Sequence, residues 1–239
     1  MFEFIADMGK LLLAIYGLRL AIRIYVQRQQ PTWSGPLARR RLTVLLILVL
    51  AVFAIKMVED VLAGESGIFD RMILLFVHEH VPRKLTGFFE WVTFTGSSTF
   101  LSVLTAGTAI TMLFARRRFE AFLLTASVLC AAAVVYIVKI AVSRVRPTLW
   151  ETDWYWGSSF PSGHTLVVAA FATSIALSVT RAWPQARPLA VTVAVSWISL
   201  VGLSRLVLGV HWPTDVLVAG CIGAILPLVV SVALDLHDA

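Results

Sequence analysis

Residues 119–142 read FEAFLLTASVLCAAAVVYIVKIAV, and only Glu120 near the start and Lys139 near the end of this run carry a charge. A helix needs about 20 predominantly apolar residues to cross the hydrocarbon core of a bilayer. The run therefore predicts a membrane-spanning helix.

The remainder of the chain has the same apolar character. Of its 239 residues, 59% are hydrophobic and 14% are charged, whereas about a quarter of the residues in an ordinary soluble domain are charged. The apolar stretches, separated by short polar segments, are Leu42–Val58, Thr99–Ala115, Phe119–Val142, Thr165–Val179, Leu189–Leu208 and Val216–Leu234. The sequence predicts an all-α, integral-membrane bundle of six transmembrane helices, with residues 1–239 forming one domain.

The N-terminal segment, residues 1–40, differs from these stretches because basic residues interrupt it. We expect Leu11–Val26 to form a helix that lies at the membrane interface. Arg19 and Arg23 near its middle would each cost about 2.5 to 3.5 kcal/mol inside the bilayer. A seventh span is the alternative for this segment.

The formal net charge of +6 and the pI of about 9.8 would suggest nucleic-acid binding in a soluble protein. Here the arginines cluster at the ends of apolar stretches, as Arg39-Arg40-Arg41 and Arg116-Arg117-Arg118. That pattern is typical of cytoplasmic loops. We therefore expect no nucleic-acid partner.

The same charge pattern predicts the topology. The positive-inside rule places both termini in the cytoplasm, with the acidic residues between positions 59 and 79 on the opposite side. Segments 143–163 and 209–214 then face away from the cytoplasm. Phe88–Phe94 has the amphipathic aromatic composition of an interfacial helix or of a wall along which a lipid enters.

Polar residues gather in three motifs at predicted helix ends on that outer side. They are Lys139-x6-Arg146-Pro147, Pro161-Ser162-Gly163-His164 and Ser204-Arg205-x5-His211-x3-Asp215. Lys139 either extends to the interface or serves a buried anion. Ser162 and Gly163 either form an ordinary helix cap or leave free backbone N–H groups that can bind phosphate.

The third motif brings an acid close to a histidine. Pro213 at the first helical position leaves Asp215 in the first turn, where its carboxylate can fold back toward His211. A carboxylate so placed orients an imidazole and stabilises the cation that forms on nucleophilic attack. An acid in this position also favours the helix dipole, which is the simpler explanation. The spacing from His211 favours the functional interpretation.

Together the motifs predict a cationic pocket with two histidines, which suits a phosphate ester. Positioned Arg and Lys side chains stabilise the oxygens of a phosphoryl group during its transfer. Neither a carboxylate cluster suited to Mg²⁺ nor a zinc-type Cys/His cluster accompanies the motifs. We therefore expect a site without metal or other cofactor.

The three ordered motifs, within residues 139–215, resemble the tripartite signature of the type-2 phosphatidate phosphatase superfamily. The resemblance implies a membrane lipid phosphatase that acts through a phosphohistidine intermediate. It implies catalytic roles for His211 as nucleophile, for Asp215, which orients it, and for His164, which protonates the leaving oxygen and later activates water. The phosphate-binding residues that it implies are Lys139, Arg146, Ser162, Gly163 and Arg205, with a supporting role for Ser204.

Other polar and aromatic features have simpler explanations. His78-Glu79-His80 offers too few ligands for a metal without further partners, so a solvated loop is expected. Trp150, Trp154 and Trp156 are expected to anchor the interface, although they could also shape a lipid entrance. Arg144 lies between the signature positions and either adds charge or flanks the helix.

The resemblance leaves the substrate open among undecaprenyl diphosphate, phosphatidylglycerophosphate, phosphatidate and lipid A. The short chain resembles bacterial undecaprenyl diphosphate phosphatases and their relatives, which implies a bacterial inner membrane. The charge pattern predicts that the site lies on the periplasmic or otherwise extracytoplasmic side. The alternative function is a transporter or binder of phosphorylated lipids that does not hydrolyse them, because intramembrane Lys, Arg and His also line transport paths. The sequence does not indicate an oligomeric state.

Overall fold

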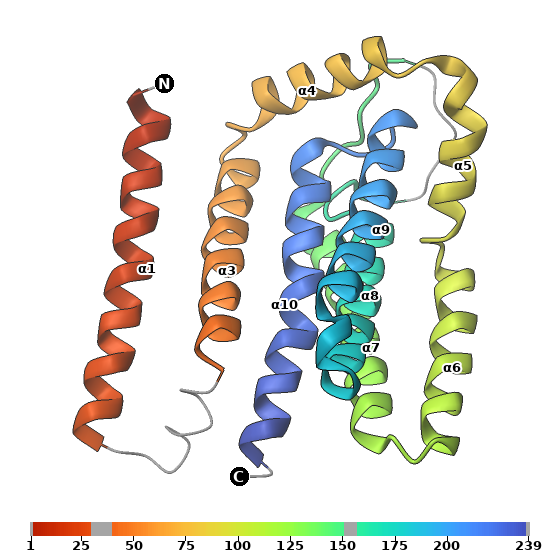
Figure 1. Ribbon diagram of the computed structural model, residues 1–239. Coiled ribbons are helices and arrows are strands. Elements are labelled where there is room, and N and C mark those ends of the chain that lie inside the picture. The colour runs from red at the N-terminus through yellow and green to blue at the C-terminus, as the bar shows by residue number, and fades with distance from the viewer. Residues whose placement is uncertain (1, 30–39, 151–156, 238–239) are drawn as a thin grey trace.

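The computed structural model describes residues 2–29, 40–150 and 157–237, and the elements in these ranges are helices (Figure 1). In chain order they are α1 (Phe2–Gln29), α3 (Arg41–Leu62), α4 (Gly67–His80), the 3₁₀ turn η1 (Arg83–Leu85), α5 (Thr86–Phe94), α6 (Ser98–Phe114), α7 (Arg118–Val142), α8 (Gly163–Ala182), the 3₁₀ turn η2 (Pro184–Ala186), α9 (Arg187–Val207) and α10 (Pro213–His237). This confirms the all-α class.

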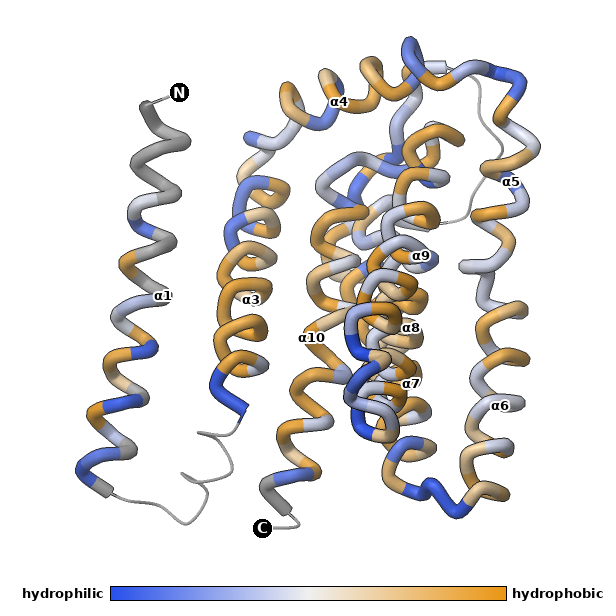
Figure 2. Tube along the Cα trace, viewed as in Figure 1, coloured by the Kyte–Doolittle hydropathy of each residue, from blue (hydrophilic) through white to orange (hydrophobic). Residues whose placement is uncertain are grey.

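The described residues contain five helices that are long and apolar enough to cross a bilayer. These are α3, α7, α8, α9 together with η2, and α10. A sixth span arises where residues 83–94 and α6 are joined through a bend of 44°. Figure 2 shows the apolar residues along these helices and hydrophilic residues at many of their ends. The predicted transmembrane bundle is thus confirmed. The predicted span Thr99–Ala115 corresponds to α6, the second helix of the bent pair.

Helix α8 is the centre of the bundle, since it packs against α7, α9 and α10. Small side chains such as Ala169 and Ala170 are fully buried along it. Gly223 of α10 lies so close to α8 that a Cβ there would be 2.3 Å from the backbone oxygen of Leu166. Small residues are what allow helices to approach closely in a membrane, where lipid offers no hydrophobic driving force between them.

Helix α4 lies across one end of the bundle, and the chain then descends through α5 into α6 (Figure 1). The end of the bundle that α4 crosses is called the α4 end. Gly96 occupies the bend between α5 and α6, where a Cβ would be 2.9 Å from a methyl group of Val201 and 3.3 Å from the Cβ of His164. The bend therefore packs directly against the start of α8.

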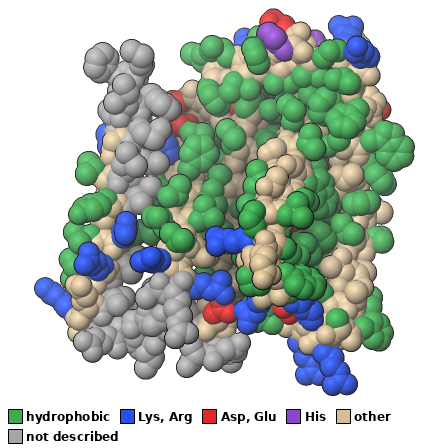
Figure 3. Space-filling view, viewed as in Figure 1, with side chains coloured by type: hydrophobic (Ala, Val, Ile, Leu, Met, Phe, Trp, Pro, Cys, Tyr) green, Lys and Arg blue, Asp and Glu red, His purple; other side chains and the backbone are tan. Residues whose placement is uncertain are grey.

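Basic residues mark the opposite end of the bundle. The Arg116–Arg118 turn between α6 and α7 lies there, as does the end of α10 (Figure 1). Figure 3 shows most of the visible Lys and Arg side chains toward that end of this face, below a broad band of hydrophobic side chains. At the same end, Asp235 of α10 forms an ion pair with Arg181 of α8 at 2.9 Å.

Helix α1 is longer than the predicted Leu11–Val26 and stands beside α3, along the bundle rather than across its end (Figure 1). Its Phe2 end lies at the α4 end of the molecule. This orientation differs from that of a helix lying flat at an interface and is the one that a seventh span would have. Lys10 and three arginines keep α1 out of the set of strongly apolar helices. Its position relative to a bilayer stays a prediction.

Candidate active site

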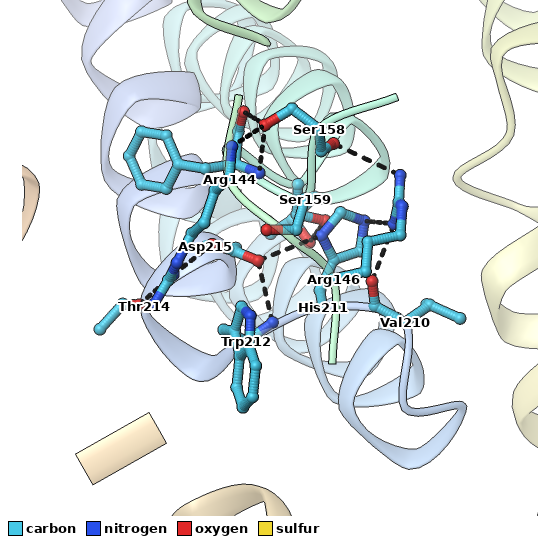
Figure 4. A network of polar contacts seen from close by, with 12 residues as sticks. Arg144, Arg146, Ser158, Ser159, Val210, His211, Trp212, Thr214 and Asp215 are labelled. Atoms are coloured by element: carbon cyan, nitrogen blue, oxygen red, sulfur yellow. Dashed lines mark hydrogen bonds and ion pairs between the residues drawn. The ribbon is translucent and has the colours of Figure 1, made fainter. Parts of the chain in front are cut away.

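The three sequence motifs meet at the α4 end of the bundle because each lies at a helix end there. The first runs from the last turn of α7 into the loop after it, the second opens α8, and the third joins the end of α9 to the start of α10. Figure 4 shows how residues from the first and third motifs, and from the loop before α8, converge.

His211 and Asp215 form the most deeply buried part of this site, with exposed fractions of 2% and 0%. The Nδ1 atom of His211 lies 3.5 Å from Oδ2 of Asp215, at the outer limit of a hydrogen bond (Figure 4). The same Oδ2 accepts a hydrogen bond of 2.9 Å from the backbone N–H of Trp212. The carboxylate folds back toward the histidine as the sequence predicted.

The other ring nitrogen of His211 faces the cationic side of the site. Its Nε2 atom lies 3.4 Å from a guanidinium nitrogen of Arg146. Burial is the largest cause that lowers the pKa of His211 from 6.5 to about 4; Arg205 and Arg146 act in the same direction, and Asp215 opposes them. At neutral pH the imidazole is therefore uncharged, which is the form that can act as a nucleophile.

Arg146 and Lys139 converge on one backbone oxygen in the loop before α8. Lys139 Nζ and Arg146 both donate to the carbonyl of Ser158, the latter at 3.4 Å. Arg146 also donates to the carbonyls of Gly157 at 3.2 Å and of Val210 at 2.8 Å. Lys139 therefore reaches inward to this loop and lies beside Arg146, which in turn adjoins His211.

The second motif begins α8. Ser162 is the N-cap residue, but its hydroxyl makes no capping bond; it lies 3.0 Å from the hydroxyl of Thr165 instead. Its backbone N–H donates to the carbonyl of Asp215 at 3.2 Å, which ties the start of α8 to that of α10. His164, in the first turn, lies within electrostatic range of His211, Arg205, Lys139 and Arg146.

Arg205 completes the cationic side from α9. It has an exposed fraction of 1% and donates to the hydroxyl of Thr93 on α5 at 2.6 Å. Ser204 is also buried, and its hydroxyl donates to the carbonyl of Val201 within α9, a structural contact. The structure thus brings all the predicted site residues to one end of the bundle, while their roles stay predictions.

Two residues that the sequence did not assign to the site belong to its geometry. Asp70 of α4 is fully buried and accepts hydrogen bonds from Arg144 and Thr214. Arg144 also donates to Asp215 at 2.6 Å, so of its two predicted roles it adds charge to the site and does more than flank the helix. One signal was available: Asp70 shares the i, i+4, i+7 face of α4 with the buried Leu74 and Val77.

His78-Glu79-His80 forms the end of α4, so the expectation of a loop there was wrong, and Trp150 follows α7. His78 stacks on Trp150, with ring centroids 4.0 Å apart, and His80 stacks on Phe76 at the same separation. The indole of Trp150 also covers Gly209, whose φ of +68° suits glycine. Trp154 and Trp156 lie outside the described residues. Among the described residues, no group of three or more His, Cys, Asp or Glu side chains could hold a metal.

Relatives of known identity match parts of this chain. Phosphatidylglycerophosphatase B of Escherichia coli (strain K12) is 41% identical over 83 residues, which make up 34% of this chain and 32% of that relative. The chain therefore spans about a third of the length of that relative. Phosphatidylglycerophosphatase B of Bacillus subtilis (strain 168) is 30% identical over 138 residues, or 56% of this chain and 68% of the relative.

The fold also matches a solved structure. The crystal structure of a transmembrane PAP2 type phosphatidylglycerolphosphate phosphatase from Bacillus subtilis aligns with a TM-score of 0.71 and 25% identity, over 77% of this chain and 94% of that one. The family model described as the PAP2 superfamily matches residues 120–236, which contain all three motifs. By sequence and by fold, this membrane-embedded helical chain belongs to the PAP2 superfamily.

Proposed function

We propose that this protein is a lipid phosphatase that hydrolyses a phosphate monoester or diphosphate of a membrane lipid through a phosphohistidine intermediate. The observation that carries the proposal is the geometry around His211. One ring nitrogen faces the Asp215 carboxylate at 3.5 Å, and the other faces Arg146 at 3.4 Å. A binder that does not hydrolyse its ligand has no need of a buried, oriented and uncharged imidazole.

In the first step, Nε2 of His211 attacks phosphorus, and the bond between phosphorus and the leaving lipid oxygen breaks. His164 donates a proton to that oxygen. The positive charge that develops on the imidazole is stabilised by Asp215. Lys139, Arg146 and Arg205, with Ser162 and the backbone N–H of Gly163, hold the phosphoryl oxygens.

In the second step, His164 removes a proton from water, and the water oxygen attacks phosphorus. The P–N bond breaks, which releases inorganic phosphate and restores neutral His211. Both steps use only side chains of this protein, so turnover needs no metal.

A phosphate-release assay on purified protein in detergent tests the reaction. We expect hydrolysis of at least one of phosphatidylglycerophosphate, phosphatidate, undecaprenyl diphosphate and lipid A, and equal rates with and without excess EDTA. Release of phosphate from none of these lipids, although they bind, would support the transporter or binder. Turnover that stops on chelation and returns with Mg²⁺ would sink the metal-free mechanism.

The intermediate is tested by rapid quench with ³²P-labelled substrate and an alkaline workup that preserves phosphohistidine. His211→Ala should carry no label and should lose at least about a thousandfold in kcat. His164→Ala should hydrolyse natural lipids slowly but should still be phosphorylated by p-nitrophenyl phosphate, whose leaving group needs no proton. Full labelling of His211→Ala, or label on His164, would overturn the assignment of the nucleophile.

A further inference from the structure

Asp70 is a buried carboxylate on α4, outside the three motifs. Its exposed fraction is 0%. A buried carboxylate is costly unless hydrogen bonds or an opposite charge compensate it. The partners of Asp70 therefore indicate what α4 contributes to the site.

Both oxygens of Asp70 bind the first turn of α10. Oδ1 accepts from the backbone N–H of Thr214 at 2.9 Å, and Oδ2 accepts from the hydroxyl of the same threonine at 2.9 Å. The first N–H groups of a helix lack partners within the helix. Asp70 thus caps α10 from a different helix, and it does so next to Asp215.

Arg144 joins Asp70 to Asp215. One guanidinium nitrogen donates to Oδ2 of Asp70 at 2.6 Å and to the hydroxyl of Ser66 at 3.0 Å. The other donates to Oδ1 of Asp215 at 2.6 Å and to the hydroxyl of Thr214 at 2.8 Å (Figure 4). One cation therefore bridges two fully buried carboxylates through separate nitrogens, a geometry that only the planar fork of arginine provides.

The bridge determines which oxygen of Asp215 faces the histidine. Because Arg144 holds Oδ1, Oδ2 is left for the backbone N–H of Trp212 at 2.9 Å and for Nδ1 of His211 at 3.5 Å. Hydrogen bonds to both oxygens restrict the rotation of the carboxylate. A second layer of contacts of this kind fixes the orientation of the groups that act directly.

We propose that Asp70 and Arg144 are positioning residues for the nucleophile and that they act through Asp215. Helix α4 then contributes to the active site through Asp70. This inference rests on the proposed phosphohistidine mechanism. It predicts that the two residues affect the rate of phosphorylation of His211 and have little effect on substrate affinity.

A double-mutant cycle with Asp215→Asn tests the inference. Asp70→Asn and Arg144→Gln should each lower kcat at least about tenfold and change KM less than about twofold in the wild-type background, yet lower kcat less than about threefold in Asp215→Asn. The reason is that both act through a carboxylate that the second background lacks. Arg144→Lys, which keeps the charge but cannot reach both acids with separate nitrogens, should behave like Arg144→Gln.

The matched control is Glu79→Gln, an acid-to-amide change at an exposed position of the same helix, which should leave kcat unchanged. Equal losses in the two backgrounds, or a rise in KM at constant kcat, would overturn the inference. Should Asp70→Asn fail to fold, the two Arg144 variants decide in the same way. Wild-type turnover and phosphohistidine labelling are measured in the same preparations, so that failure of the proposed function is seen separately.

Discussion

The chemistry proposed for the centre of the site depends on an imidazole held without charge. Burial lowers the pKa of His211 to about 4. In the unfolded chain the same group would titrate near 6.5. Between these two values the unfolded state binds more protons, so the free energy of unfolding falls as the pH drops from about 6.5 toward 4. Above that window this contribution is constant.

His211 should therefore stay neutral at pH 5.5 and take up a proton only near pH 4. We expect this titration in ¹H–¹³C NMR spectra of histidine-labelled protein in micelles, with the resonance identified by its loss in His211→Gln. Asp215→Asn should lower the pKa further, because the carboxylate favours the charged ring. A midpoint near 6.5 would contradict the effect of burial.

That the three motifs meet at one end of the bundle could be predicted from sequence, because each motif is compact and lies at the end of an apolar run. Asp70 could not be assigned in this way. Its partner Thr214 lies 144 residues further along the chain, and local spacing carries no information about such a contact. The role of Arg144 was missed for the same reason, since both acids that it binds lie more than 70 residues away.

Among the elements, α8 and α10 pack most closely, and glycine permits this contact. In Gly223→Ala the added Cβ would lie 2.3 Å from the carbonyl oxygen of Leu166 and 2.6 Å from the Cβ of Ala169. The backbone cannot yield as a flexible side chain would, so we expect a destabilisation of about 1 to 3 kcal/mol. The measurement is thermal unfolding in detergent, where the apparent melting temperature should fall.

Gly220→Ala is the control for that substitution. Its new Cβ would meet only a methyl group of Ile198, at 4.0 Å, which is ordinary contact. The two variants differ in the space around the added carbon, while the helix and the chemistry of the change are the same. Equal melting temperatures for the two would show that α8 and α10 are not tightly packed at Gly223.

The positions of the helices could be predicted from sequence, whereas some of their directions could not. Hydrophobic length alone located α3, α7, α8, α9 and α10 to within a few residues. The 44° bend before α6 was not visible, because it depends on how Gly96 packs against Val201 and His164. The apolar residues of the N-terminal segment are interrupted by arginines, and this pattern does not indicate whether α1 lies flat at the membrane interface or stands beside α3.

At the scale of the whole molecule, the candidate site and the basic turn at Arg116–Arg118 lie at opposite ends of the bundle (Figure 1). The positive-inside rule then predicts that the site faces away from the cytoplasm. Single cysteines at Glu79 on α4 and at Gln185 in η2, both exposed positions, test this in a background without Cys130 and Cys221. In intact cells an impermeant maleimide should label position 79 and leave position 185 unlabelled.

Permeabilised cells supply the control, because both positions should then react. Label at 185 without label at 79 in intact cells would show an inverted topology. The lipid phosphate would in that case have to come from the cytoplasmic leaflet. Gln185 is preferable to the neighbouring arginines for this purpose, since replacing it leaves the charge that orients the chain unchanged.

The contact between Asp70 and Thr214 also sets an order of events during synthesis. Helix α4 is synthesised well before α10. Asp70 therefore cannot bind Thr214 until the last span has been made. Until then the chain carries Lys139, Arg146 and His164 but has neither His211, the proposed nucleophile, nor Asp215, the carboxylate proposed to orient it. On the proposed mechanism, a chain released early by the ribosome is expected to be inert toward the lipids around it, and the protein would become reactive only when its insertion is complete.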